Sequence, residues 1–106
     1  MKYRVLKHKS SADGSEQYSM VSEQGVVDFS VLNSEMWIHN WTCPGEGRVF
    51  LKELEKYAKN KSLKLVIPNP LNPKLVHILS DNKYYPKEVD YEIEPGIIEK
   101  IEIWQK

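Results

Sequence analysis

Two side chains that could accept protons lie four residues apart in one short segment. Glu35 and His39 fall within residues 35–41, whose aromatic and apolar residues predict a strand. Because alternate residues of a strand point the same way, both side chains are expected on one face of a sheet. There, either could take a proton from an attacking amine. A structural role, as an exposed strand end and a hydrogen-bonded sheet histidine, fits the same pattern.

A pair of glycines follows this segment and directly precedes an expected amphipathic helix over residues 47–59. Gly45 and Gly47 flank Glu46. The first amides of a helix have no partners inside it, and the helix dipole places about half a positive charge there. Phosphate groups bind at such ends, and glycine lets them approach the main chain. A tight turn between strand and helix would use the same glycines, so the pattern leaves both roles open.

Other groups with reactive or aromatic side chains carry weaker patterns. Cys43 is the single cysteine; a nucleophilic role would require a neighbouring base or cation, and the alternative is a free thiol. The histidines and this cysteine lack the spacing of a zinc site, so no metal is expected. Trp37 and Trp41 are expected on one face of the strand over 35–41. They would flank a cleft, cover the sheet or mediate association of the chain with itself.

The elements that position these residues follow from alternation, turn residues and helical spacing. The expected strands span residues 2–9, 17–22, 27–32, 35–41, 63–67, 84–93 and 97–104, and the expected helices cover residues 47–59 and begin at Asn72-Pro73. Short connections favour an antiparallel meander for the first four strands. The order β-β-β-β-α-β-α-β-β predicts an α/β or α+β fold in a single domain over residues 1–106.

Composition and charge narrow the class of protein. The 106 residues include 15 basic and 15 acidic side chains, so the net charge is zero. This balance argues against nucleic-acid binding, and no apolar run reaches the ~20 residues of a membrane span. The first residues lack the apolar block of a signal peptide, which indicates a cytoplasmic protein. Residues 48–87 are strongly basic and could face an anionic ligand or form an ordinary solvated surface.

The element order and the glycine turn together resemble the GNAT superfamily of N-acetyltransferases over residues 37–85. That family's loop reads roughly V-x-P-x-[YF]-[QR]-x-x-G-x-[GA], and an ungapped match places Trp37, Trp41, Gly45 and Gly47 on its valine, aromatic and glycine positions. The family's later elements are matched by Phe50, Leu51, Leu54, Ala58, residues 63–67, Asn72, Leu75, Ile78 and Leu79. The resemblance implies a mixed, mostly antiparallel sheet with two main helices.

The resemblance also implies an activity, which is transfer of an acetyl group from acetyl-coenzyme A to an amine of a small molecule or protein. The implied cofactor-binding residues are Trp41, Thr42, Gly45, Glu46, Gly47, Arg48 and Asn72. Glu35 and His39 would serve as bases, and Tyr84, or alternatively Tyr85, would protonate the departing thiolate. A helix cap at Asn72 and a packing role for Tyr84 are the structural alternatives.

Several positions depart from the family pattern. Thr42 stands where glutamine or arginine usually shapes the pyrophosphate loop, and Leu79 replaces the tyrosine that protonates the thiolate in many members. Glu46 adds a negative charge beside the expected phosphate site. The two helices that usually follow the first strand have no room, since residues 10–15 alone separate the strands. A catalytically silent binding or regulatory module of the same fold is therefore the alternative function.

Overall fold

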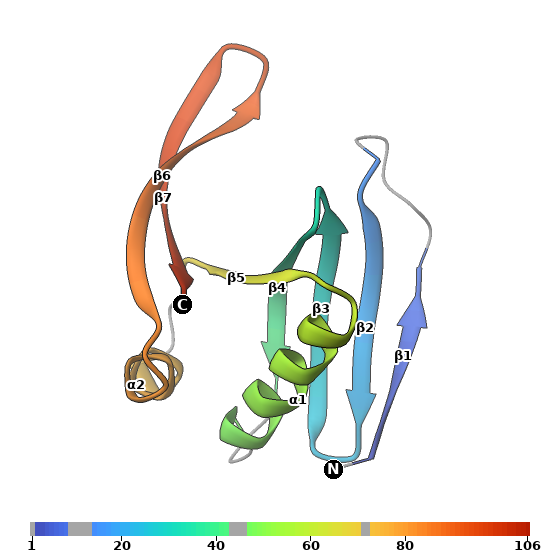
Figure 1. Cartoon of the computed structure of the whole chain (residues 1–106). Coiled ribbons are helices and arrows are strands. Elements are labelled where there is room, and N and C mark those ends of the chain that lie inside the picture. Colours follow the sequence, from blue (N-terminus) through green and yellow to red (C-terminus); the bar gives the residue numbers. More distant parts are fainter. Residues whose placement is uncertain (1, 9–13, 43–46, 71–72) are drawn as a thin grey trace. The chain divides into compact units, whose positions relative to one another are not determined.

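The computed structural model describes residues 2–8, 14–42, 47–70 and 73–106 of the chain. These residues form nine elements in the predicted order (Figure 1). The strands are β1 Tyr3–Lys7, β2 Glu16–Ser22, β3 Gly25–Leu32, β4 Glu35–Thr42, β5 Lys64–Pro68, β6 Tyr85–Glu94 and β7 Ile97–Gln105, and the helices are α1 Gly47–Asn60 and α2 Pro73–Asp81. Each boundary lies within about two residues of its prediction, a normal margin for element ends.

The hydrogen-bonded strand order is β1-β2-β3-β4-β5-β7-β6. β4 and β5 run parallel, and the other ladders are antiparallel. The fold is therefore α+β, with a mixed, mostly antiparallel sheet and two helices, as predicted. The chain divides into two compact units, Met1–Val66 and Ile67–Lys106. β5 contributes its first three residues to the N-terminal unit and its last two to the C-terminal unit.

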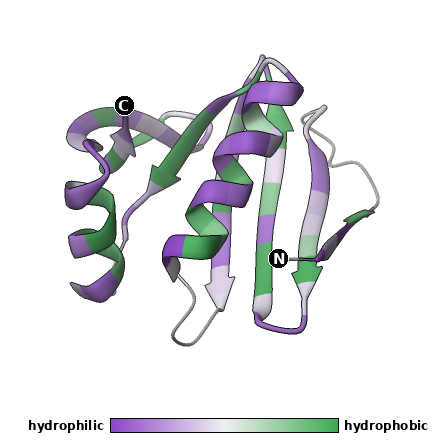
Figure 2. Cartoon of the chain, turned by 60° about the horizontal axis from the view of Figure 1, so that its bottom comes forward, coloured by the Kyte–Doolittle hydropathy of each residue, from purple (hydrophilic) through white to green (hydrophobic). Residues whose placement is uncertain are grey.

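The core of the N-terminal unit lies between α1 and one face of the strands β2 to β4 (Figure 1). The buried residues of α1 recur at helical spacing, and hydrophobic and hydrophilic positions alternate along this helix (Figure 2). The buried apolar side chains of the unit are Met20, Val27, Phe29, Met36, Ile38, Phe50, Leu51, Leu54, Ala58, Leu65 and Val66. Burying a side chain such as Phe50 contributes roughly 1.5–3 kcal/mol. We name this side of the strands the α1 face.

Aromatic rings connect this helix to the sheet. The ring of Phe29 stacks on that of Tyr18, with 5.3 Å between centroids, and meets the ring of Tyr57 edge-on at 5.5 Å. Such pairs contribute about 0.5–1.5 kcal/mol beyond the area they bury. Since Phe29 belongs to β3 and Tyr57 to α1, the contact fixes which side of the sheet the helix covers.

A β-bulge interrupts the ladder between β3 and β4. Phe29 pairs with Ile38, and Asp28 pairs with Asn40, so His39 is the extra residue on β4. Beyond the bulge, Trp41 pairs with the buried Val27. Because paired residues share a face, Trp41 lies on the α1 face, whereas Trp37, paired with Ser30, lies on the opposite face. The prediction that the two tryptophans share a face is therefore wrong.

The C-terminal unit consists of α2, the end of β5 and the β6–β7 hairpin. Ile67 of β5 pairs with Trp104 of β7. The hairpin turns at Pro95-Gly96, where Gly96 has a φ of 83°. A proline followed by a residue of positive φ is typical of a type II turn, in which glycine avoids steric strain. The buried apolar residues of this unit are Ile67, Leu79, Tyr84, Ile103 and Trp104.

Candidate functional site

The face of the N-terminal strands opposite the α1 face carries a group of polar side chains. Its members are His8, Ser19, Asp28, Ser30, His39 and Asn40, and we name this group the polar face. Asp28 and Ser30 alternate with the buried Val27 and Phe29 along β3 and therefore point away from α1. His8, His39 and Asn40 are exposed, so solvent reaches the group.

Two hydrogen-bonded sets make up the polar face. In the first, Ser19 Oγ donates to Asp28 Oδ1 at 2.5 Å, and His8 Nε2 lies 2.6 Å from the same serine oxygen. Asn40 Nδ2 donates to Asp28 Oδ2 at 3.3 Å. In the second, Ser30 Oγ lies 2.6 Å from His39 Nε2. Ser19 and Ser30 are buried, and these bonds satisfy their hydroxyls, as buried polar groups require.

His39 combines a basic nitrogen with a shifted pKa. Burial of part of the ring lowers the pKa of His39 below its ordinary value of 6.5, and the nearby charge of Asp28 opposes this shift. A lowered pKa favours the neutral imidazole, which is the form that accepts a proton. Alternation from Glu35 and Trp37 places this side chain on the polar face, and the bulge changes the side of the residues that follow it, Asn40 and Trp41.

Glu35, the second predicted base, begins β4 on the same side as His39. Its Oε1 accepts a hydrogen bond of 3.4 Å from Trp37 Nε1. Glu35 and Trp37 are two residues apart along β4 and therefore lie on the same face. Trp37 pairs with Ser30 of the polar face. The structure therefore places Glu35 and His39 on one face of the sheet, as their spacing predicts.

The predicted cofactor-binding residues lie at the end of β4 and the start of α1. Trp41 is half-buried and Thr42 exposed at the end of β4, and Gly47 and Arg48 open α1, with Arg48 exposed. Gly45, Glu46 and Asn72 lie outside the described residues, as does Cys43. The first turn of α1 contains no acidic residue, so no carboxylate there opposes the positive end of the helix dipole.

The ladder between β4 and β5 is short. It joins Glu35 to Lys64, Met36 to Leu65 and Trp37 to Val66. β4 then continues from Ile38 to Thr42, and among the described residues of the N-terminal unit β3 is its strand partner there. A strand edge without a neighbouring strand presents main-chain N–H and C=O groups in the plane of the sheet. This edge leads toward the start of α1.

Tyr84, the predicted acid, belongs to the C-terminal unit. It lies between α2 and β6 and is 3% exposed. The Lys106 ammonium lies 5.2 Å from the centroid of its ring, within the range of a cation–π contact. Its main-chain N–H donates to the Leu79 carbonyl at 3.0 Å, at the end of α2.

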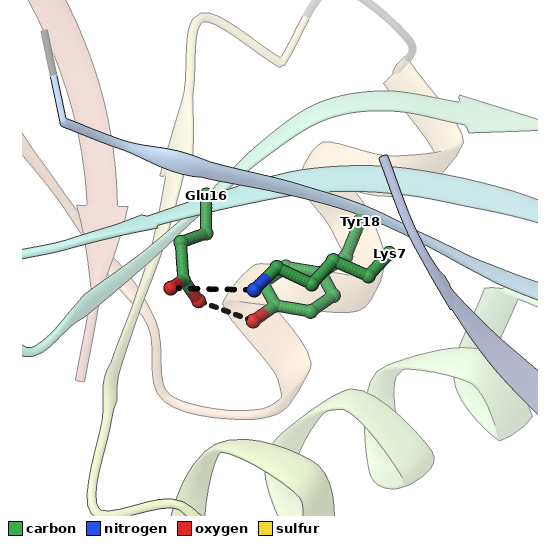
Figure 3. A network of polar contacts seen from close by, with 3 residues as sticks. All are labelled: Lys7, Glu16 and Tyr18. Atoms are coloured by element: carbon green, nitrogen blue, oxygen red, sulfur yellow. Dashed lines mark hydrogen bonds and ion pairs between the residues drawn. The ribbon is translucent and has the colours of Figure 1, made fainter. Parts of the chain in front are cut away.

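A further polar network lies on the α1 face, on strands β1 and β2. The hydroxyl of Tyr18 donates to a carboxylate oxygen of Glu16, and Lys7 Nζ lies 3.6 Å from the other carboxylate oxygen (Figure 3). The hydrogen bond from Tyr18, followed by the charge of Lys7, lowers the pKa of Glu16. The same bond, followed by burial, raises the pKa of Tyr18 to about 12. Glu16 thus links Lys7 of β1 to Tyr18 of β2.

Sequence analysis did not identify Ser19, Asp28 and Ser30 as members of a site. Alternation along residues 27–32 does place Asp28 and Ser30 on one side, so the sequence indicated that these two side chains share a face. The contact between Ser30 and His39 depends on the register of β3 against β4, which the sequence of either strand alone does not indicate.

Two kinds of feature are absent from the described part of the chain: a helix that could span a membrane and a cluster of metal-ligating side chains. Neither helix there is long and apolar enough to cross a membrane. Over the same residues, no three His, Cys, Asp or Glu side chains gather in a way that could hold a metal ion.

Comparison with known proteins identifies a similarity of fold. No family model matches the chain, and no curated protein matches its sequence. Among solved structures, the crystal structure of a "putative acetyltransferase" from Agrobacterium tumefaciens is similar, with a TM-score of 0.57 and 14% sequence identity. The match covers 98% of this chain and 74% of that chain. This chain therefore shares the α+β fold described above with that protein.

Proposed function

We propose that this chain binds acetyl-coenzyme A and transfers its acetyl group to an amine of a small molecule or protein. Among the described residues of the N-terminal unit, β4 has β3 as its one strand partner beyond Trp37, and this observation carries the proposal. An extended arm with amide groups can pair with such an edge as an added strand would. The diphosphate would lie at the start of α1, where helix amides and the dipole favour anions.

The residues of this site have distinct roles in the proposal. The main-chain amides of Gly45, Glu46, Gly47 and Arg48 would hold the diphosphate, and Trp41 and Thr42 would border the arm. Asn72 is the further residue proposed to contact the arm. The exposed side chain of Lys52 lies one helical turn beyond Arg48 on α1, and both could reach the phosphates.

The proposed reaction is a direct transfer between the thioester and the amine. The amine nitrogen attacks the thioester carbonyl, and the neutral imidazole of His39 or the carboxylate of Glu35 takes the proton that the nitrogen loses. The carbon–sulfur bond breaks, and Tyr84 gives a proton to the departing thiolate. General-base catalysis of this kind contributes about 10²- to 10⁴-fold in rate.

Calorimetric titration with acetyl-coenzyme A tests the binding step. We expect micromolar binding that weakens as salt rises, because phosphate contacts are electrostatic. Gly47→Glu puts a carboxylate at the start of α1 and should abolish binding while circular dichroism stays unchanged. Asn60→Glu makes the same charge change at the other end of α1 and should leave the affinity unchanged. No heat at millimolar ligand, or equal affinity in Gly47→Glu, would remove the proposal.

One observation favours the alternative of a silent binding module. Leu79, at the position of the tyrosine that serves as the acid in many GNAT enzymes, is fully buried in the C-terminal unit. It can neither donate a proton nor reach solvent. An assay of free thiol release with a panel of primary amines separates the two functions, because the module would bind acetyl-coenzyme A without releasing thiol in excess of a control lacking protein.

A further inference from the structure

Ser30 and His39 form a close hydroxyl–imidazole pair on the polar face. Ser30 Oγ lies 2.6 Å from His39 Nε2, and Ser30 is 7% exposed. His39 itself is exposed, so reagents in solution reach the pair from the imidazole side. A serine hydroxyl becomes nucleophilic when a neighbouring neutral imidazole can accept its proton.

The alternation of side chains along β4 brings Ser30 and His39 to the same face of the sheet. The direct partner of Ser30 across the ladder is Trp37, and His39 is the extra residue beyond it. Diagonal neighbours of this kind lie within reach of a long side chain. The proton-accepting state is favoured as well, because burial lowers the pKa of His39 below its ordinary value and outweighs the opposing charge of Asp28.

We propose that Ser30 and His39 are a nucleophilic pair that accepts an acyl group from activated esters and thioesters. Ser30 Oγ attacks the acyl carbonyl carbon while His39 Nε2 takes the hydroxyl proton. The bond from the carbonyl carbon to the alcohol oxygen or thiol sulfur breaks, and the leaving group takes the proton from His39. The products are an acyl ester on Ser30 and the free alcohol or thiol. This activity requires neither coenzyme A nor an amine, and so extends beyond the function proposed above.

A second serine–histidine contact nearby provides a matched comparison. Ser19 is 6% exposed, and its Oγ lies 2.6 Å from His8 Nε2. Its hydroxyl proton is directed to Asp28 Oδ1 at 2.5 Å. A hydroxyl has one proton to donate, so Ser19 accepts from His8 and the imidazole is the donor. His8 therefore cannot remove the proton of Ser19, and this pair is inactive in the proposal.

Acetylation of the full chain by p-nitrophenyl acetate tests the proposal. Release of p-nitrophenolate gives the rate, and peptide mass spectrometry after an acid quench locates the acetyl group. We expect the acetyl group on Ser30 in the wild-type chain. His39→Gln should slow the reaction by about 10²-fold or more, the range of general-base catalysis, whereas His8→Gln and Ser19→Ala should leave the rate unchanged.

Four outcomes would overturn the proposal: acetyl groups on Ser19, acetyl groups confined to lysines, a stable adduct on a histidine ring, or an equal rate in His39→Gln. The variant Ser30→Ala removes the proposed nucleophile. If circular dichroism shows that this variant does not fold, the position of the adduct in the wild-type chain and the rate of His39→Gln decide whether the proposal holds. Since the probe contains no coenzyme A, a negative result here leaves the calorimetric test of the proposed function intact, and the converse also holds.

Discussion

The phenol of Tyr18 illustrates how one hydrogen bond sets the titration of two residues. Its hydroxyl donates to Glu16, which raises the pKa of Tyr18 to about 12 and lowers that of Glu16 (Figure 3). The folded state thus holds the phenolic proton more tightly than the unfolded chain, whose value is 10.0. The resulting stability is fully present below pH 10 and is lost as the pH rises toward 12.

Replacing the acceptor should release this proton earlier. In Glu16→Gln the negative charge disappears, so the pKa of Tyr18 should fall toward 10. Tyrosinate absorbance in the near ultraviolet measures the effect: the titration of the wild-type chain should contain a phase near pH 12 from Tyr18, and this phase should move to lower pH in the variant. Tyr85→Phe removes the phenolic hydroxyl of a residue that is 67% exposed and should keep the late phase of Tyr18. A late phase that survives in Glu16→Gln would contradict the assignment.

The turn of the hairpin between β3 and β4 holds two residues in the left-handed backbone conformation. Both turn residues have positive φ, 52° at Asn33 and 65° at Ser34, as a type I′ turn requires. Lys64 N donates to the Ser34 carbonyl at 2.9 Å, so the turn also receives the start of β5. Asparagine tolerates this conformation, whereas serine is strained in it.

Ser34→Gly should therefore stabilise the chain. Glycine adopts the left-handed conformation without a clash and completes the Asn-Gly pair favoured in such turns, for a gain of roughly 0.5–1 kcal/mol. Urea unfolding followed by circular dichroism measures the change in free energy. Gln24→Gly, in the turn between β2 and β3 and without positive φ, should give no gain. A loss of stability in Ser34→Gly would show that the glycine's extra freedom in the unfolded state outweighs the relief of strain.

Elements of this chain were predictable because their signals are local. Turn residues at 33–34 and 95–96 and the helical spacing from Phe50 to Ala58 are read from a few neighbouring positions, and the structure confirms them. The bulge at His39 was not predictable, because one extra residue changes the pairing between strands and not the composition of either. It reversed the side of Trp41 and left Glu35 and His39 on one face, and the contact of His39 with Ser30 was missed because it depends on the register between two strands.

The buried apolar residues are distributed unevenly over the whole molecule. Among the described residues, eleven belong to the N-terminal unit, from Met20 to Val66, and five to the C-terminal unit, from Ile67 to Trp104. In the β6–β7 hairpin, Tyr91, Ile97 and Ile98 are 48%, 47% and 62% exposed. The ion pair between Lys100 and Glu88 at 3.5 Å is exposed as well and contributes little.

The rates of main-chain hydrogen exchange should therefore differ between the two units. Local opening is easiest where few apolar contacts are lost, so main-chain amides of β6 and β7 should exchange faster than those of α1 and β3. Native-state exchange followed by mass spectrometry of peptides measures this difference. Phe50→Ala, which removes a fully buried ring from the N-terminal unit at a cost of about 3–5 kcal/mol, should erase most of the protection of α1 and β3. Equal protection in both units of the wild-type chain would mean that the hairpin is held by contacts other than its own buried residues.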